Sequence, residues 1–205
     1  MKQVISILLI TALLLNGCNS NSKQPAENKE STTTNEIKTK NMDNNNFTTA
    51  ILVDKTPEEV FNAINNVRGW WSEAIDGSTD KLNAEFNYHF KDVHICKMKI
   101  IEFIPGQKVV WLVLENYFNF TKDKTQEWKS TKISFEIAKK EDKTQLVFTH
   151  IGLVPEYECY KICVGAWGNY IGGSLKNLIE TGKGNANPYE PAIKSAEILE
   201  KENKE

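Results

Sequence analysis

The sequence predicts an α+β domain in which a curved antiparallel sheet of about six strands wraps around one long C-terminal helix. Between residues 47 and 153, the strand-like runs mostly alternate apolar and polar residues, which is typical of antiparallel strands with one face in water. One long segment near the C-terminus has helical apolar spacing instead. Because the apolar face of the sheet needs cover, and this helix is the only long element, we expect the sheet to enclose it.

The first predicted strand is Phe47–Asp54, and two short helices follow it. Thr56 offers a hydroxyl cap and Pro57 suits the first helical position, so the first helix should begin there. The second helix ends at the Trp70-Trp71 pair. The remaining strands are predicted at residues 84–90, 93–103, 108–114, 131–138 and 144–153.

The long helix is predicted from Pro155 to about Thr181, with Gly182 as its stop. Its buried stripe is expected to consist of Tyr160, Val164, Trp167, Ile171, Leu175 and Leu178. Glycines at 165, 168, 172 and 173 interrupt the pattern, and each weakens a helix by roughly 1 kcal/mol against alanine. Two interpretations stay open: the glycines let the backbone approach the sheet and so leave gaps beside the large aromatic residues, or they only relieve crowding against the strands.

Residues 1–18 have the pattern of a lipoprotein signal peptide. A basic start precedes the apolar run Val4–Leu15, which is shorter than the roughly 20 residues that a membrane-spanning helix needs. The run ends at Gly17-Cys18, which resembles a bacterial lipobox, although Asn16 departs from its usual small or β-branched residue. We expect cleavage after residue 17, acylation of Cys18 and attachment to the bacterial cell envelope. A plain secretory signal is the alternative.

Residues 19–46 are almost entirely polar, so they are predicted to form a disordered tether between the lipidated cysteine and the folded domain. The folded domain then covers 47–184, and a charged tail over 185–205 is predicted to form a loose surface helix. The formal net charge of −2 and the pI near 6.0 provide no basic surface, so we expect no nucleic-acid partner.

Three segments occur in the same order as in a known superfamily. They are VFNAINNVRGWW at residues 60–71, THIGL at 149–153 and GAWGNYIGGSLKNLIETGKG at 165–184. With the layout of the elements, they resemble the activator-of-heat-shock-protein-ATPase homologue branch of the START-like (SRPBCC) superfamily, over about residues 47–184. The resemblance implies a helix-grip fold with a cavity between sheet and helix. Members of the superfamily bind or transform many apolar molecules.

The inward-facing positions of the predicted strands and helix suggest which residues line such a cavity. The alternation places His150 on the inner face with Leu146 and Phe148. The candidate pocket residues are Trp71, Phe86, Tyr88, Met98, Trp111, Phe135, Phe148, His150, Tyr160, Cys163, Trp167 and Tyr170. Tyr117, Phe118, Phe120 and Trp128 lie in the connection after the 108–114 strand. They could line the mouth of the pocket, form a partner surface or cap the open end of the sheet, and a mixed role is preferred to a pure binding one.

Four of the inward residues are also candidate metal ligands: His94, Cys96, His150 and Cys163. They come from separate elements, and no Cys-x-x-Cys pair anchors them, so no metal or other cofactor is expected. In an oxidising compartment, Cys96 could instead pair with Cys159 or Cys163, whereas Cys159 and Cys163 are poorly placed to pair with each other. Free buried thiols are the default interpretation.

No nucleophile motif is present, since Gly-x-Ser-x-Gly is absent and Ser174 lies within the helix. The acid–base candidates are His150, His94, Glu115 and Glu158. The leading hypothesis is a lipid-anchored, non-enzymatic module that binds a small apolar or amphipathic ligand. A cyclase-like or hydrolase-like enzyme using the same cavity, and a co-chaperone-like interaction domain, remain alternatives.

Overall fold

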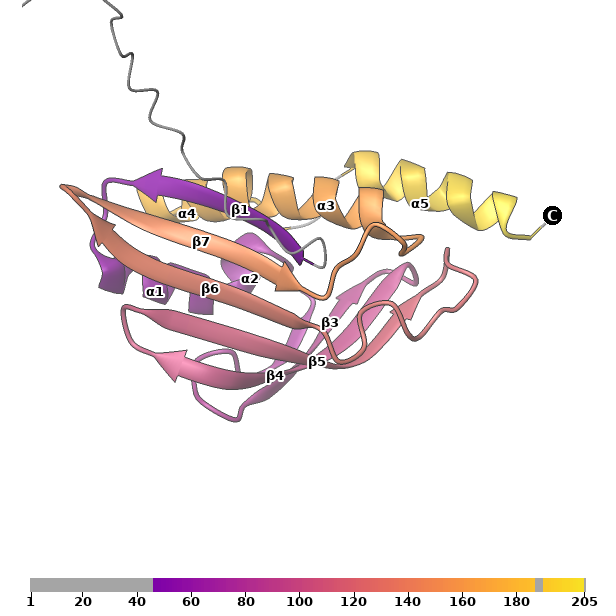
Figure 1. Cartoon of the computed structure of the whole chain (residues 1–205), viewed down its shortest axis with the longest axis horizontal. Coiled ribbons are helices and arrows are strands. Elements are labelled where there is room, and N and C mark those ends of the chain that lie inside the picture. The colour runs from indigo at the N-terminus through magenta and orange to yellow at the C-terminus, as the bar shows by residue number, and fades with distance from the viewer. Residues whose placement is uncertain (1–45, 187–189, 205) are drawn as a thin grey trace, which may run out of the picture. The chain divides into compact units, whose positions relative to one another are not determined.

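A seven-stranded antiparallel sheet curves around the C-terminal helix in the computed structural model, which describes residues 46–186 and 190–204 (Figure 1). The signal peptide, Cys18 and nearly all of the tether lie outside the described residues. The strand order is β1-β7-β6-β5-β4-β3-β2, with every neighbouring pair antiparallel. The strands are β1 (Asn46–Val53), β2 (Ile75–Gly77), β3 (Glu85–Phe90), β4 (His94–Ile104), β5 (Lys108–Phe118), β6 (Lys132–Lys140) and β7 (Lys143–Ile151).

The predicted α+β helix-grip architecture is confirmed, with two differences in the strands. Strand β2 was not predicted, because three residues are too few for an alternation to show. Strand β5 extends four residues beyond its predicted end at residue 114, where the apolar run gives way to Glu115 and Asn116. The register of β4 against β5 shifts twice along their length, which marks irregularities of the β-bulge kind and contributes to bending the sheet.

The two short helices were predicted in the right places. They are α1 (Pro57–Asn65) and α2 (Val67–Trp70). The start of α1 is a capping box: the Glu59 backbone N–H donates to the Thr56 hydroxyl, and the Glu59 carboxylate accepts the Thr56 backbone N–H at 2.8 Å. Trp70 is fully buried at the end of α2, where its indole N–H donates to the Ile64 carbonyl at 3.0 Å.

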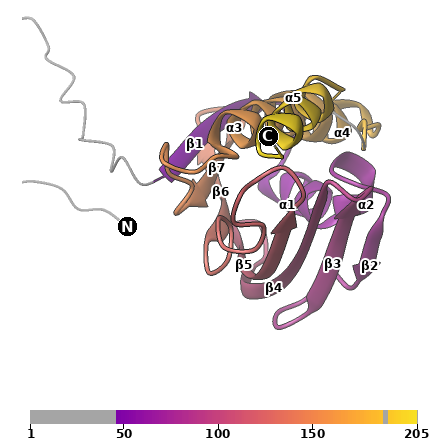
Figure 2. The ribbon, with the colours of Figure 1, turned by 90° about the vertical axis from the view of Figure 1, so that its right-hand side faces the viewer.

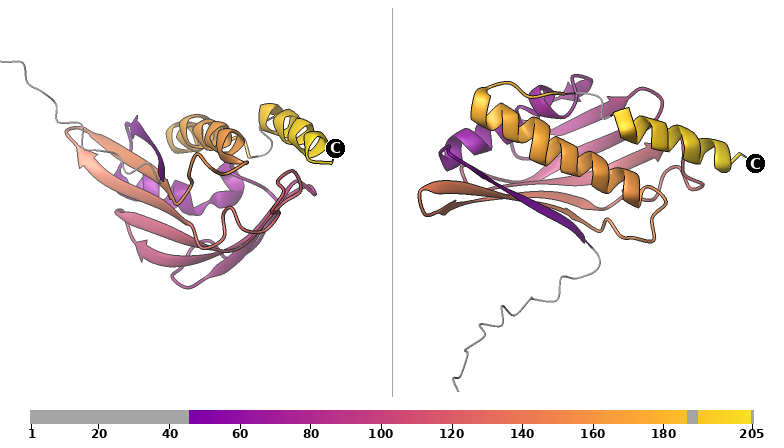
Figure 3. Two further views of the ribbon diagram at one scale, coloured as in Figure 1. Left: turned by 45° about the vertical axis from the view of Figure 1, so that its right-hand side comes forward. Right: turned by 90° about the horizontal axis from the view of Figure 1, so that it is seen from above.

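The long C-terminal helix lies across the concave face of the sheet (Figure 3). It consists of α3 (Tyr160–Asn169), the π-helical segment η1 (Tyr170–Leu175) and α4 (Lys176–Thr181). The predicted end is confirmed, since Gly182 adopts a left-handed φ of 77°. The predicted start at Pro155 was wrong: residues 155–159 form turns, and the helix begins at Tyr160. The Glu127 carboxylate, distant in sequence, accepts the backbone N–H groups of Glu158 and Cys159, the two residues that precede the helix.

A further helix, α5 (Glu190–Glu202), lies beside α3 in the C-terminal tail (Figure 2). It is tied to the β5–β6 connection, because the Asn203 amide donates to the Phe120 carbonyl at 2.7 Å and the Asn119 amide to the Glu200 carboxylate at 3.4 Å. Leu199 packs against the core. In the part of the chain that the structure describes, no helix combines the length and the apolar character needed to span a membrane.

The core between sheet and C-terminal helix consists largely of aromatic rings. Trp111 of β5 stacks on both Trp70 and Trp71, with ring centroids 6.3 and 5.9 Å apart. Phe135 packs against Trp111 from the neighbouring strand. Ser174 ties the π-helical segment to α2, because its hydroxyl donates to the Trp70 carbonyl at 2.7 Å. Most of the space under the helix is therefore filled, and a void can remain only toward one end.

Gly168, Gly172 and Gly173 do not bring the helix backbone against the sheet. A methyl group at Gly168 or Gly172 would meet no atom within 4 Å, and at Gly173 it would meet only the Asn169 side chain, at 3.7 Å. Neither interpretation offered by the sequence therefore holds for Gly168 and Gly172, which lie on the exposed face. No contact in the structure explains why these positions are glycine.

We expect Gly168→Ala to raise the free energy of unfolding by up to about 1 kcal/mol, because alanine restricts the unfolded chain and fits the helix without a clash. Gly182→Ala is the opposing control. Its left-handed backbone should make that substitution cost about 1 kcal/mol. Urea unfolding of the three proteins measures both effects, and destabilisation by Gly168→Ala would contradict the expectation.

Candidate functional site

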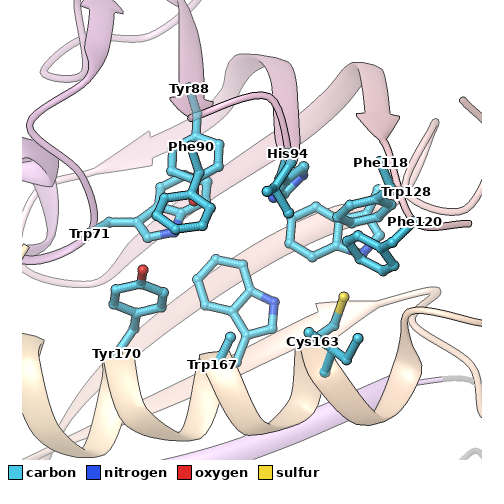
Figure 4. A pocket seen from close by; sticks show the side chains of 13 residues that line it. Trp71, Tyr88, Phe90, His94, Phe118, Phe120, Trp128, Cys163, Trp167 and Tyr170 are labelled. Carbon is cyan, nitrogen blue, oxygen red and sulfur yellow. The ribbon is translucent and has the colours of Figure 1, made fainter. Parts of the chain in front are cut away.

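A cavity of about 70 Å³ lies between α3 and the far ends of β3, β4 and β5 (Figure 4). Eight of its thirteen described lining residues are Phe, Tyr or Trp. The lining residues are Trp71, Tyr88, Phe90, Val93, His94, Phe118, Phe120, Trp128, Ile162, Cys163, Ala166, Trp167 and Tyr170. Phe90, Val93, Ile162 and Ala166 are partly exposed and so form the mouth.

Five of the twelve candidate pocket residues border this cavity: Trp71, Tyr88, Cys163, Trp167 and Tyr170. Six others are buried in the packed core instead, and they are Phe86, Met98, Trp111, Phe135, Phe148 and His150. Tyr160 is only partly buried and does not line the cavity. Strand alternation identifies the inner face of a sheet, but it cannot tell which inner residues border a void.

The end of β5 and its connection to β6 supply three cavity-lining aromatic residues that are absent from the twelve candidate pocket residues. Phe118, Phe120 and Trp128 all line the cavity and are at most 3% exposed. Of the roles that the sequence left open for this segment, lining the pocket is the one that these three residues have, since they form part of the cavity wall. The Glu127 carboxylate, in the same segment, accepts the backbone N–H groups of Glu158 and Cys159, the two residues before α3, at 2.5 and 3.0 Å and so holds the turn that leads into the helix.

Ring packing fixes the walls of the cavity. Trp71 stacks on Tyr88 with centroids 4.2 Å apart and planes 8° from parallel. On the opposite wall, Trp128 stacks on Trp167 with centroids 5.7 Å apart and planes 14° from parallel. Burial raises the pKa of Tyr88 well above its usual value, and a hydrogen bond with Tyr170 is a further cause. The Tyr88 hydroxyl group is therefore neutral at physiological pH.

His150 lies at the centre of a closed hydrogen-bond chain. The Trp167 indole N–H donates to His150 Nδ1 at 3.1 Å, so the ring proton is on Nε2. Nε2–H donates to the Thr131 hydroxyl at 3.0 Å, and that hydroxyl donates to the Trp128 carbonyl at 2.6 Å. Burial, with His94 as a smaller cause, lowers the pKa of His150 to about 3. This neutral imidazole has no free nitrogen for acid–base chemistry.

His94 borders the cavity directly, unlike His150. Its Nε2 lies 3.1 Å from Asn116 Oδ1, which can only accept, so Nε2 is protonated and Nδ1 keeps its lone pair. Burial lowers the pKa of His94 to about 3, against the opposing effect of the Asn116 hydrogen bond. The cavity therefore contains a neutral histidine that can accept a hydrogen bond.

The other two acid–base candidates lie away from the cavity. Glu115 is exposed on β5, where the strand turns this side chain toward water. Glu158 accepts the Lys122 backbone N–H at 2.7 Å and lies 4.0 Å from the Lys122 ammonium group. Neither carboxylate borders the cavity, so the wall carries no acidic partner for His94.

The candidate metal ligands do not form a site. Within residues 46–186 and 190–204, no group of three or more His, Cys, Asp or Glu side chains is arranged to hold an ion. Both nitrogens of His150 are engaged, and burial raises the pKa of the Cys96 thiol well above its usual value. The disulfide alternative does not occur either, since Cys96, Cys159 and Cys163 are free and buried.

Comparison with known proteins rests on structure. No protein-family model matches the sequence, and no curated protein matches it. An Aha1 dimer from Colwellia psychrerythraea has a TM-score of 0.56 and 24% sequence identity over 68% of this chain and 98% of that chain. Protein SSP2350 from Staphylococcus saprophyticus has a TM-score of 0.52 and 16% sequence identity over 69% of this chain and 97% of that chain. The chain has the START-like helix-grip fold.

A third structure, DynU16 from the dynemicin biosynthetic locus, has a TM-score of 0.53 and 14% identity, and the match covers 70% of this chain and 50% of that one. At these identities the likeness concerns the fold. The START-like architecture places the inner face of the sheet opposite the C-terminal helix, and the residues of this chain decide how much of that space stays open. Here the large side chains of Trp70, Trp111 and Phe135 fill one end, and the cavity remains at the other.

Proposed function

We propose that this START-like domain binds one end of a small, uncharged, mainly apolar molecule in the cavity beside α3. The observation that carries the proposal is the chemistry of the wall: eight aromatic side chains and no Asp, Glu, Lys or Arg among the described lining residues. A charged group entering this wall would lose its hydration without gaining an ionic partner. An apolar group would gain about 25 cal/mol for each Å² that it removes from water.

The size of the cavity limits what it accepts. Its volume is about 70 Å³, whereas an engineered protein cavity of about 150 Å³ binds a whole benzene molecule. The cavity therefore suits the end of a ligand, with the remainder emerging at the mouth between Phe90, Val93, Ile162 and Ala166. A lipid chain would not fit within it. A membrane anchor through acylated Cys18 is part of the same proposal and is supported by the sequence pattern of residues 1–18.

A substitution that fills the cavity tests the proposal. Ala166 lies on α3 at the mouth, so Ala166→Phe should occupy the space that a ligand would use. We expect this variant to weaken the binding of toluene, a simple apolar probe, by about tenfold or more while the protein remains folded. Titration followed by ¹⁵N–¹H NMR measures the affinity. Gly168→Ala, on the exposed face of the same helix, is the matched control and should bind toluene as the wild type does.

A wild type that shows no toluene-dependent shifts at Cys163 or Ala166 would contradict the binding proposal. The alternative of a cyclase-like or hydrolase-like reaction through His150 gains no support from the geometry, because both nitrogens of that ring are engaged and the side chain does not border the cavity. No contact of the described residues favours the co-chaperone-like alternative over ligand binding.

A further inference from the structure

The mouth of the cavity has two rims. One rim belongs to α3, where Ile162 and Ala166 are partly exposed. The other belongs to the end of β3 and the turn after it, where Phe90 and Val93 are partly exposed. Asn119 adjoins this second rim, because its backbone N–H donates to the Val93 carbonyl at 3.1 Å. A molecule that enters the cavity through this mouth passes between the two rims.

Helix α5 is attached on both sides of the mouth. It contacts α3, and it lies on the side of α3 that faces away from β1 (Figure 2 and Figure 3). On the other side, the Glu200 carboxylate accepts from the Asn119 amide at 3.4 Å, and the Asn203 amide donates at 2.7 Å to the carbonyl of Phe120, a lining residue. Leu199 is partly buried against the core. A helix held on both sides of an opening crosses that opening.

The attachment of α5 is weaker than the packing of the elements beneath it. The bond between Asn119 and Glu200 is long at 3.4 Å, and Ile198 is 58% exposed. None of the described residues of α5 lines the cavity. Segments with few buried apolar contacts open locally at low cost in free energy. Helix α5 can therefore leave the mouth while α3 keeps its place on the sheet.

We infer that α5 is a lid on the cavity, which closes over a ligand that fits inside and has to move away for a ligand that protrudes. This inference rests on the proposed function and adds a limit on ligand size to the same site. A protruding ligand binds only the open form, so the closed form competes with it. Its apparent affinity is reduced by the fraction of molecules in which the lid is open.

Xenon and toluene are the probes that separate the two forms of the lid. Xenon is a single apolar atom of the kind that enters dry protein cavities, whereas toluene is too large for this cavity and protrudes. In wild-type protein, we expect both probes to shift the ¹⁵N–¹H resonances of Cys163 and Ala166. Toluene should also shift the resonances of Leu199 and Asn203, because it displaces α5, and xenon should leave those two unchanged.

Leu199→Ala removes the apolar contact that holds the lid. We expect the open fraction to rise by about tenfold, as for losing part of a buried leucine side chain. Toluene should then bind about tenfold more tightly than to the wild type, since its apparent affinity follows the open fraction. Xenon affinity should stay unchanged. Ile198→Ala is the matched control, because it changes the neighbouring, exposed side chain of the same helix and should alter neither affinity.

The outcomes separate this inference from the proposed function. If toluene binds Leu199→Ala as it binds the wild type, or more weakly, the lid inference is overturned and ligand binding in the cavity stands. If neither probe shifts a lining residue of the wild type, the proposed function fails and the lid inference with it. Asn203→Ala removes only the hydrogen bond to Phe120 and should tighten toluene binding by about fivefold. This second variant decides the question should Leu199→Ala not fold.

Discussion

We expect the free energy of unfolding to fall by about 4 kcal/mol between pH 7.5 and pH 5.0, because two buried histidines stay neutral in the folded protein. Burial lowers the pKa of both His94 and His150 to about 3, whereas an unfolded histidine titrates near about 6.5. The folded pKa lies below the unfolded one, so the stabilisation is fully present above about pH 6.5 and is lost as the pH falls toward 3. A loss of this size is comparable to the total stability of many domains, which is about 5–15 kcal/mol.

Urea unfolding at a series of pH values measures the slope of stability against pH. Each buried histidine should contribute up to about 1.4 kcal/mol per pH unit in this range. His94→Gln and His150→Gln should therefore each remove about half of the slope. His89→Gln is the matched control, because His89 is exposed on β3 and its replacement should leave the slope as it is. A wild-type stability that stays level from pH 7.5 to 5.0 would show that these rings gain protons without unfolding the protein.

The sequence was sufficient to predict the position of His150 but not its role. Alternation along β7 correctly placed this residue on the inner face with Leu146 and Phe148. Its partners, Trp167 and Thr131, come from α3 and the start of β6, and only the packing of these elements brings them to the two ring nitrogens. A pattern with period two specifies a face, whereas the engagement of a nitrogen atom depends on distances between elements that are far apart in the chain.

The cavity shows the same limit of prediction from the sequence. Tyr88 and Trp167 were predicted as pocket residues because they lie on inner faces, and they do border the void. Phe135 and Phe148 satisfy the same criterion and are fully buried in the packed core. The difference arises from side-chain volumes that fill one end of the space and leave the other open, which is a property of the whole assembly of rings rather than of any segment.

Glu127→Ala should lower the free energy of unfolding by about 3–5 kcal/mol, because it leaves the backbone N–H groups of the two residues before α3 without an acceptor. The Glu127 carboxylate is 9% exposed and accepts the N–H groups of Glu158 and Cys159. Hydrogen bonds to a charged acceptor contribute about 1.5–3 kcal/mol each. The carboxylate also lies at the positive end of the helix dipole. Urea unfolding of Glu127→Ala, with Glu156→Ala as an exposed control in the preceding turn, measures the effect.

The same contact links the helix start to the cavity. Ile162 and Cys163 lie in the first turn of α3 and form part of the cavity wall. When the cap is removed, this turn should fray, and toluene should bind more weakly to Glu127→Ala than to Glu156→Ala. Glu127→Gln keeps one carbonyl oxygen as an acceptor and should lose roughly half of the stability that the alanine variant loses. If the free energy of unfolding of Glu127→Ala lies within about 1 kcal/mol of the wild-type value, water has replaced the carboxylate at these N–H groups. In that case the helix start at Tyr160 does not depend on the β5–β6 connection.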